Sequence, residues 1–353
     1  MAQFKFGSRR INKQAQLDDF SLTLLTVIII ALVAIVLITA IYGVIFTLSN
    51  PDVDFPEINI GEESADYPFR QEIDLPLPEY SEKPEATIPA DAIASEYAAL
   101  YNVTDGEILA SRKSTSLMYP ASMTKIMTLI VVYENLPSED SLDEVLEIKI
   151  PRGEHSGYGF EVGEKLTVED LIYAAILQSD GVACITLAEY VAGSEANFVK
   201  MMNEKVKELG LLEGDPETNP STNFTNCTGL HEQYHYTTAY DMSVITAYAM
   251  RNAYCAKVLT CMSYKPSSNF RPGEGCTFWN ALLHNRLNDG AIQPSNATIK
   301  GGKTGWTGKD SGYCIATFAR GKDGKDYVIV TAKADGWSAA VDDTIKICND
   351  YIK

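Results

Sequence analysis

The sequence lacks the residue spacing of a structural metal site and the basic charge of a nucleic-acid-binding protein. It has no CxxC pair and no Cys/His spacing of the kind that holds zinc, so we expect no structural metal site. Its 29 Lys and Arg residues stand against 47 Asp and Glu, giving a net charge of −18. Binding to phosphates needs a basic surface, so a nucleic-acid partner is not expected. Internal repeats are absent as well, and 353 residues leave room for one large domain or two smaller ones.

Cysteine is modest in number and scattered along the chain. The seven residues are Cys184, Cys227, Cys255, Cys261, Cys276, Cys314 and Cys348. In an extracytoplasmic domain some of these could pair, and their odd number would leave at least one thiol unpaired. We favour the simpler interpretation that most of them are small apolar residues of the core.

A long stretch without charge stands near the N-terminus. Residues 20–48 contain no charged side chain and are dominated by Leu, Ile, Val and Ala. This run exceeds the ~20 residues needed to cross a bilayer, and it is too long for the core of a signal peptide. Four basic residues precede it: Lys5, Arg9, Arg10 and Lys13. The positive-inside rule therefore predicts a cytoplasmic tail at 1–19, a single transmembrane helix at 20–48 in the cell membrane, and an extracytoplasmic remainder. A cleaved signal peptide is the alternative, and it puts the remainder on the same side.

The next segment is acidic and rich in proline. Residues 51–91 hold seven prolines and twelve Asp or Glu against Arg70 and Lys83, so this stretch carries about −10 of the net charge. Such a composition buries too little apolar surface to offset the entropy lost on ordering. We therefore expect residues 49–91 to form an extended linker, and residues 92–353 to form the folded domain.

The remaining sequence has the pattern of a mixed α/β domain. Strands are predicted at 97–101 and 107–111 around Asp105-Gly106, and at 313–319 and 327–332 around 322–324. Helices are predicted at 122–136, at 171–177 after a capping box at 167–170, at 198–209 before Gly210, and at 339–352. Because strands lie at both ends with helices between them, we expect one sheet built from the two ends of the domain.

The motif at 122–125 carries the first chemical signal. Ser122 and Lys125 lie three residues apart at the start of a predicted helix, so they share one of its faces. The helix dipole favours negative charge on the serine oxygen, and apolar neighbours are expected to lower the pKa of the lysine amine. A neutral amine at this spacing can take the hydroxyl proton and so activate serine without histidine. The spacing alone is common, and a helix cap beside a solvated lysine is the competing interpretation.

Two later segments strengthen the chemical interpretation. Lys303, Thr304 and Gly305 enter the C-terminal strands, where a cation and a hydroxyl could bind a substrate carboxylate and glycine could let backbone N–H groups approach an oxyanion. Ser179 follows an apolar helix in Gln178-Ser179-Asp180-Gly181, and its hydroxyl could relay protons. A simple turn at the helix end explains that segment equally well when it is taken alone.

In this order the three motifs resemble those of the penicillin-recognising serine enzymes. Further segments narrow the resemblance to the low-molecular-mass D-alanyl-D-alanine carboxypeptidases, peptidase family S11. These segments are Pro120-Ala-Ser-Met-Thr-Lys-Ile-Met-Thr128, Leu187-Ala-Glu-Tyr-Val-Ala-Gly193, Thr222-Asn-Phe-Thr-Asn-Cys-Thr-Gly-Leu-His231 and Thr237-Thr-Ala-Tyr-Asp-Met242. The resemblance covers residues 92–353. It implies a serine β-lactamase/transpeptidase-like α/β domain, with an antiparallel sheet built from both ends, flanking helices and a helical subdomain.

The resemblance also implies roles for individual residues. Ser122 would be the acyl-forming nucleophile, Lys125 its general base, and Ser179 the relay that carries a proton to the leaving D-alanine. Lys303 and Thr304, with Gly305 beside them, would hold the terminal carboxylate of the substrate. The backbone N–H groups of Ser122 and Trp306 would form the oxyanion hole. No metal or organic cofactor is implied.

Two departures from the family pattern stand out. The middle triplet is usually Ser-Gly-Asn, whereas here it is Ser179-Asp180-Gly181, so glycine replaces the amide expected to contact a substrate carbonyl. Losing that hydrogen bond is expected to cost about 1–3 kcal/mol, and an ionised Asp180 cannot donate in its place. The sequence after the last strand also leaves no room for the C-terminal β-rich domain and amphipathic helix of many relatives, so we expect the N-terminal span to serve as the anchor.

The sequence thus predicts a serine-type D-Ala-D-Ala carboxypeptidase that trims peptidoglycan stem pentapeptides and is acylated by β-lactams. A D,D-endopeptidase differs from it only in the preferred leaving group. A class A β-lactamase-like hydrolase would need a deacylating glutamate in an E-x-x-L-N segment, and the nearest candidate, Glu217-Thr-Asn-Pro, lacks that pattern. A catalytically silent cell-wall-binding homologue is the remaining alternative, suggested by Gly181.

Overall fold

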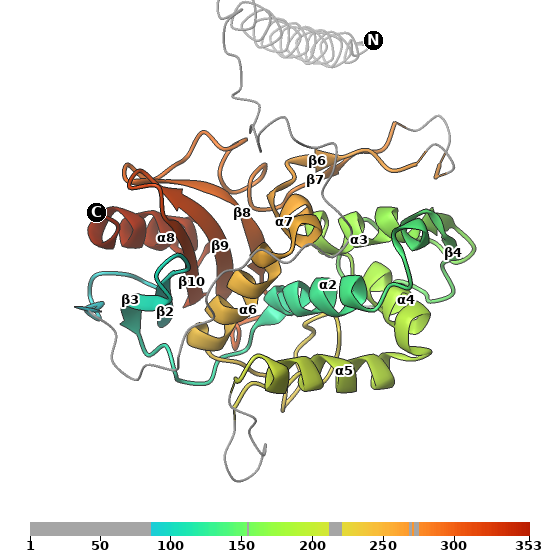
Figure 1. Ribbon diagram of the computed structural model, residues 1–353, viewed down its shortest axis with the longest axis horizontal. Coiled ribbons are helices and arrows are strands. Elements are labelled where there is room, and N and C mark those ends of the chain that lie inside the picture. The colour runs from blue at the N-terminus through green and yellow to red at the C-terminus, as the bar shows by residue number, and fades with distance from the viewer. Residues whose placement is uncertain (1–85, 154, 212–220, 268–269, 272–274) are drawn as a thin grey trace, which may run out of the picture. The chain divides into compact units, whose positions relative to one another are not determined.

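The computed structural model describes residues 86–353, except 154, 212–220, 268–269 and 272–274, and its main feature is a six-stranded sheet (Figure 1). The strands are β1 (Ala86–Thr87), β2 (Tyr97–Asn102), β3 (Glu107–Arg112), β8 (Ala297–Gly305), β9 (Tyr313–Gly321) and β10 (Asp326–Ala334). They are arranged in the order β1-β3-β2-β10-β9-β8. The expected sheet built from both ends of the domain is therefore confirmed. Neighbouring strands are antiparallel except that β1 runs parallel to β3, which makes the sheet mixed at one edge.

Helices fill the chain between the two groups of strands. They are α2 (Thr124–Glu134), α3 (Val168–Leu177), α4 (Gly181–Ala192), α5 (Glu195–Glu208), α6 (Ala239–Arg251) and α7 (Ala253–Thr260), and α8 (Trp337–Tyr351) follows the sheet. The 3-10 turns are η1 (Ala121–Met123) and η2 (Glu139–Asp143), and two small hairpins pair β4 (Val145–Glu147) with β5 (Lys165–Thr167) and β6 (Ser263–Tyr264) with β7 (Phe278–Trp279). The predicted capping box is confirmed, because the side chains of Thr167 and Asp170 each accept from the other's backbone N–H. Gly210 has φ +66° and follows α5 as predicted.

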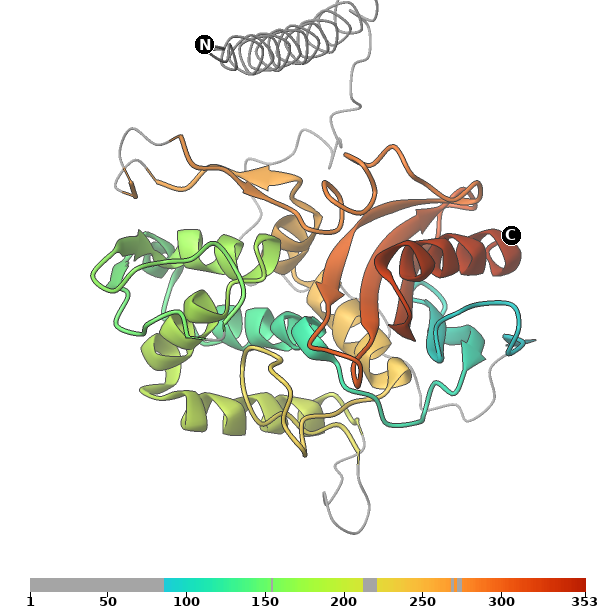
Figure 2. The same ribbon diagram turned by 180° about the vertical axis from the view of Figure 1, so that it is seen from behind.

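The sheet is buried on both faces, and alternate residues of its strands belong to different cores. Ala98 and Leu100 of β2 pack in the core that includes α8, whereas Ala99 and Tyr101 pack in the larger core with α2 and α6. This two-residue period is the one that a pleated strand imposes. Helix α8 thus covers one face and α6 the other, and α2, α3, α4 and α5 gather beyond α6 (Figures 1 and 2).

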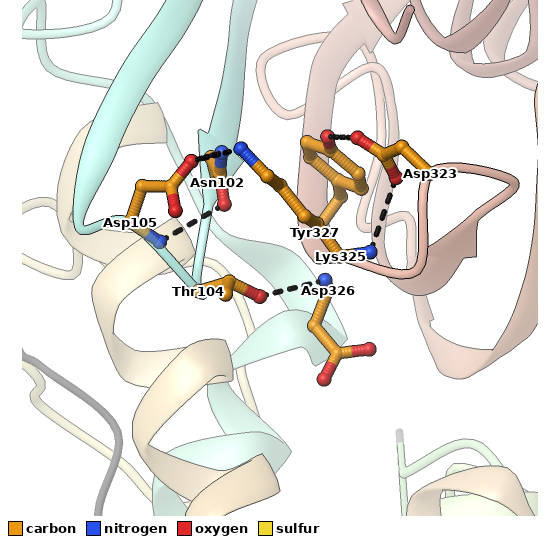
Figure 3. A network of polar contacts seen from close by, with 7 residues as sticks. All are labelled: Asn102, Thr104, Asp105, Asp323, Lys325, Asp326 and Tyr327. Carbon is orange, nitrogen blue, oxygen red and sulfur yellow. Dashed lines mark hydrogen bonds and ion pairs between the residues drawn. The ribbon is translucent and has the colours of Figure 1, made fainter.

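Polar contacts join the turns of the N-terminal and C-terminal hairpins (Figure 3). Lys325 donates to Asp105 over 2.5 Å, and the backbone N–H of Asp326 donates to the Thr104 hydroxyl over 2.9 Å. Each turn is also held internally, since Asn102 bonds to Asp105 and the Tyr327 hydroxyl donates to Asp323. These contacts extend the pairing of β2 with β10, which brings the two ends of the domain together.

The predicted transmembrane helix at 20–48, the cytoplasmic tail and most of the linker lie outside the described residues. Among the residues that are described, no helix is long and apolar enough to cross a membrane. Strand β1 and the buried Ile88 lie ahead of residue 92, where the sequence pattern placed the start of the folded domain. All seven cysteines are free thiols and five are buried, which confirms their interpretation as small core residues.

Candidate active site

Ser122 lies in the 3-10 turn η1, directly before α2, with its side chain at the edge of a cavity. The Nζ of Lys125, in the first turn of α2, lies 3.0 Å from the Oγ of Ser122. The predicted contact across one helix face is therefore present, because residues three apart meet on a helical turn. Ala121 has φ +48°, a left-handed conformation that is strained for a residue with a side chain and that sharpens the turn presenting Ser122.

Lys125 is buried, with 1% of its surface exposed. Burial is the main cause that lowers the pKa of its amine, since the charged form loses its solvation. Its Nζ also donates to the carbonyl oxygen of Thr228 over 2.5 Å. A carbonyl can only accept, so this contact takes up one N–H of the Lys125 amine and holds Nζ beside Ser122.

The segment from residue 222 to 237 holds α2 in position. The hydroxyl of Thr128 donates to the carbonyl of Cys227 over 2.7 Å, and the hydroxyl of Thr124 lies 2.8 Å from Nε2 of His235. With the bond from Lys125 to Thr228, three polar side chains of one helix are tied to this segment. The turn that carries Ser122 and the amine of Lys125 are thus held by a part of the chain about a hundred residues away.

His235 is buried and neutral, and its tautomer follows from its contacts. The backbone N–H of Thr225 donates to Nδ1 over 3.0 Å, so Nδ1 carries no proton and Nε2–H donates to Thr124. Burial lowers the pKa of His235 to about 3, and the charge of Lys125 adds to that shift. His235 is therefore a neutral structural donor beside the site.

A second amine and hydroxyl pair links β8 to the turn between α3 and α4. The Nζ of Lys303 donates to the Oγ of Ser179 over 3.0 Å and to the carbonyl of Thr304 over 2.9 Å. Lys303 is also 1% exposed, and burial followed by the charge of Lys125 lowers its pKa well below the usual value. Ser179 has φ +57°, which turns the chain sharply between the two helices.

The end of β8 lies against the nucleophile turn. A Cβ atom placed on Gly305 would sit 3.0 Å from the backbone nitrogen of Ser122 and 3.0 Å from the carbonyl oxygen of Pro120. Glycine at this position therefore permits the end of β8 to lie close to the backbone of Ser122. Trp306 follows with 53% of its surface exposed, and its ring stacks 6.0 Å from that of Tyr313.

A cavity of about 480 Å³ opens above Ser122. It is lined by Ser122, Lys125, His155, Ser156, Gly181, Thr228, Gly229, Leu230, His231, Glu232, Trp306 and Thr307. Of the expected residues, Ser122, Lys125 and Trp306 line the cavity, whereas Ser179, Lys303, Thr304 and Gly305 are not among its lining residues. No motif in the sequence pointed to His155 or Glu232, whereas His231 ends a segment that resembles the family.

The structure gives Asp180 a local role. Its Oδ1 accepts from the backbone N–H of Ala183 at the start of α4, and its Oδ2 accepts from Tyr158 over 2.8 Å. Asp180 is 1% exposed, and burial raises the pKa of its carboxyl. Its oxygens thus cap the helix and hold a loop, and Gly181 is left facing the cavity.

The fold is that of known penicillin-binding DD-peptidases. Penicillin-binding protein D2 from Listeria monocytogenes, solved in its ampicillin-bound form, is 24% identical and superposes with a TM-score of 0.62 over 75% of this chain and 100% of that one. The family model for D-alanyl-D-alanine carboxypeptidase, peptidase S11, matches residues 83–336. The chain therefore belongs to this family, as the motifs predicted.

Curated relatives carry two different peptidase names. D-alanyl-D-alanine carboxypeptidase DacF of Bacillus subtilis is 31% identical over 229 residues, 63% of this chain and 53% of that protein. A D-alanyl-D-alanine endopeptidase of Pseudomonas aeruginosa is 32% identical over 167 residues, 46% of this chain and 50% of that protein. The chain thus spans about half the length of these relatives.

Proposed function

We propose that this chain is a serine D-alanyl-D-alanine carboxypeptidase that removes the terminal D-alanine of peptidoglycan stem pentapeptides. The observation that carries the proposal is the buried Lys125 amine, with its lowered pKa, 3.0 Å from the Ser122 hydroxyl in a chain of the S11 family. A neutral base at hydrogen-bond distance is what a serine needs in order to attack a peptide carbonyl.

In the first half of the reaction, Ser122 Oγ attacks the carbonyl carbon between the two D-alanines while its proton moves to Nζ of Lys125. The oxyanion would lie between the backbone N–H groups of Ser122 and Trp306, which Gly305 brings close together. Collapse of this tetrahedral intermediate breaks the C–N bond, and the leaving amine takes up the proton that Lys125 received, so Lys125 is neutral again. An ester on Ser122 remains, and free D-alanine departs.

Ser179 and Lys303 suit the delivery of that proton. Lys303 holds the Ser179 hydroxyl over 3.0 Å, and this hydroxyl would relay the proton from Lys125 to the leaving amine. Lys303 and Thr304 would also attract the terminal carboxylate of the substrate. In the second half, water attacks the ester carbon, its proton passes to Lys125, and Ser122 leaves with a proton regained from that amine.

A fluorescent penicillin tests the nucleophile. Wild-type protein should be labelled covalently, because β-lactams present the same acyl group to Ser122, and Ser122→Ala should not be labelled. Release of D-alanine from a diacetylated Lys-D-Ala-D-Ala peptide then tests the reaction itself. Wild-type protein that never labels would favour a silent wall-binding homologue, the alternative that Gly181 suggests.

D,D-endopeptidase activity is the second candidate, favoured by the Pseudomonas aeruginosa relative of that name. It uses the same acyl-enzyme but releases a cross-linked peptide amine instead of D-alanine. Cross-linked muropeptide dimers and pentapeptide monomers offered together would separate the two. Labelling by penicillin with dimer cleavage and no D-alanine release would establish the endopeptidase.

We also propose that residues 20–48 anchor the chain in the cell membrane as a single span, with residues 1–19 cytoplasmic and the catalytic domain outside. The charge-free run and the four basic residues before it support this orientation. Protease added to intact protoplasts should degrade the domain while a cytoplasmic control protein survives. Protection of the domain until lysis would contradict this arrangement.

A further inference from the structure

Position 181, at the start of α4, has no side chain, and an imidazole occupies the space beside it. A Cβ atom placed on Gly181 would lie 2.9 Å from both Cβ and Nδ1 of His155. Distances this short leave no room for a side chain at position 181 while His155 keeps its place. The amide that the family pattern leads one to expect at position 181 is therefore replaced in space by the ring of His155.

The loop that carries His155 is fastened to the turn at 179–181. The backbone N–H of Gly181 donates to the carbonyl of Ser156 over 3.0 Å, and the hydroxyl of Ser156 donates to the carbonyl of Ser179 over 3.0 Å. A Cβ atom on Gly157 would come within 2.3 Å of Asp180, so the loop backbone lies directly on the turn. Packing and hydrogen bonds thus hold His155 beside the same turn that carries Ser179.

The His155 ring has a nitrogen without a hydrogen-bond partner among the described residues. It lines the cavity with Ser122 and Lys125, and among the described residues its buried Nδ1 has no hydrogen-bond partner. Buried polar atoms are nearly always paired, so the unpaired Nδ1 marks a ring whose hydrogen bonds the described residues do not supply in full. The imidazole N–H can donate, which an ionised carboxylate cannot do.

We propose that His155 is a specificity-determining residue that donates a hydrogen bond to the acyl-side carbonyl of the substrate, the contact made by an amide at position 181 in the family pattern. The proposal rests on the acyl-transfer function proposed for Ser122. The ligand is a peptide or a penicillin. In the peptide the accepting carbonyl belongs to the residue before the bond attacked, and in the penicillin it is the carbonyl of the acylamino side chain. Position 181 must then be glycine, because any side chain there would collide with the His155 ring.

Another histidine lines the same cavity and is the competing donor. The ring of His231 lies 4.4 Å from that of Tyr119, and its Nε2 is 4.0 Å from an oxygen of Asp310. Its environment is thus already supplied with an aromatic face and an acceptor. His155 differs in having an unpaired nitrogen next to the residue that departs from the family pattern.

Two penicillins separate the contact from the chemistry. Benzylpenicillin has the acylamino carbonyl, and 6-aminopenicillanic acid has a free amine in its place. In His155→Ala the acylation rate constant for benzylpenicillin should fall about tenfold relative to that for 6-aminopenicillanic acid, while His155→Asn, which keeps a donor, recovers part of the difference. His284→Ala, at a histidine that does not line the cavity, should leave the ratio unchanged. An unchanged ratio in His155→Ala, or a selective loss in His231→Ala alone, overturns the proposal.

The reciprocal exchange is a stricter test. Gly181→Asn alone should lose acylation, since its Cβ would collide with His155, and His155→Ala would not relieve this collision because its Cβ remains. The double variant His155→Gly with Gly181→Asn moves the donor to position 181 and should restore selectivity for benzylpenicillin to within about threefold of wild type. Thermal melting confirms that each variant is folded. If the double variant is folded but selects benzylpenicillin no better than His155→Ala does, the proposed role of His155 is overturned.

Peptide binding keeps the inference separate from the proposed function. If wild-type protein is never acylated, the diacetylated Lys-D-Ala-D-Ala peptide is titrated calorimetrically into the Ser122→Ala and Ser122→Ala/His155→Ala proteins. Binding that is at least fivefold weaker in the double variant supports the His155 contact although the function has failed. Equal binding of the peptide by the two proteins overturns the His155 contact. If wild-type protein is acylated normally and His155→Ala leaves the ratio of the two penicillins unchanged, the contact is overturned while the proposed function stands.

Discussion

The Nζ of Lys303 donates a hydrogen bond to the Oγ of Ser179 over 3.0 Å, across 124 positions of the sequence. The same distance separates Lys125 and Ser122, so the site contains two pairs of a buried amine and a hydroxyl. Burial lowers the pKa of both amines, and the charge of Lys125 lowers that of Lys303 further. Two adjacent buried cations repel each other, so the arrangement favours one neutral amine, as general-base catalysis requires.

Ser179→Ala tests the second pair. We expect the kcat for D-alanine release to fall about 10²- to 10⁴-fold, the usual range for losing a proton-transfer group, while slow penicillin labelling of Ser122 persists. The measurement is single-turnover kinetics with peptide and penicillin. Ser156→Ala is the matched control, because the Ser156 hydroxyl donates to the Ser179 carbonyl on the same turn and no hydrogen bond joins it to Lys303 among the described residues. An equal loss in Ser156→Ala would show that the turn, not the Ser179 hydroxyl, is what matters.

Lys125→Met should separate activity from stability. Acylation should fall at least about a thousandfold, because no base remains beside Ser122. The folded pKa of Lys125 is lowered, so near pH 7 the unfolded state binds its proton more tightly and the buried amine reduces stability. Replacing it with Met should therefore raise Tm by roughly 2–5 °C at pH 7. This gain in Tm should shrink as the pH rises towards 10.5. Calorimetric scans of wild type and variant at pH 7 and pH 10 measure the gain and its decrease. A gain independent of pH would mean that packing, not titration, causes it.

His235→Gln should change how stability depends on pH. The folded pKa of about 3 lies below the unfolded value of 6.5, so acid protonates the unfolded chain first and stability falls as pH drops from 6.5 towards 3. Glutamine does not titrate, so the stability advantage of wild type over the variant should narrow by about 2 kcal/mol between pH 7 and 4.5. Urea midpoints at the two pH values give the difference. A constant advantage would show that His235 does not change its protonation on unfolding.

Gly229→Ala should disturb the nucleophile from a distance in sequence. Gly229 has φ +81°, and a Cβ there would lie 2.0 Å from the carbonyl oxygen of Ala121, next to Ser122. We expect acylation to fall at least about tenfold, because misplacing reacting groups by an ångström is costly, and stability to fall by roughly 2 kcal/mol or more. Penicillin-labelling rates and urea unfolding measure the two effects.

Gly210→Ala is the matched control for that substitution. Gly210 also has a positive φ of +66°, but no described atom lies within 4 Å of a Cβ placed there. It should lose about 1 kcal/mol from backbone strain and retain normal acylation. Equal losses of acylation in the two variants would contradict a local steric effect at Ala121.

Features with a short sequence range could be predicted from the sequence. The contact of Ser122 with Lys125 follows from helix geometry, which brings residues three apart together. The capping box joins Thr167 and Asp170, which lie three positions apart, and the alternation of Ala98 and Ala99 between two cores follows from the pleat. Each of these is determined by backbone geometry within one element.

Other features of the site required the tertiary structure. No sequence pattern indicated that Asp180 would cap α4, that His235 would hold Thr124, or that His155 would fill the space beside Gly181. These contacts join loops whose paths depend on packing, and no local period encodes where a loop passes. The sequence by itself thus determined the contact of Ser122 with Lys125 and the family. Only the folded chain decided which distant side chains surround them, because long-range contacts form where the loss of chain entropy is offset by packing of the whole domain.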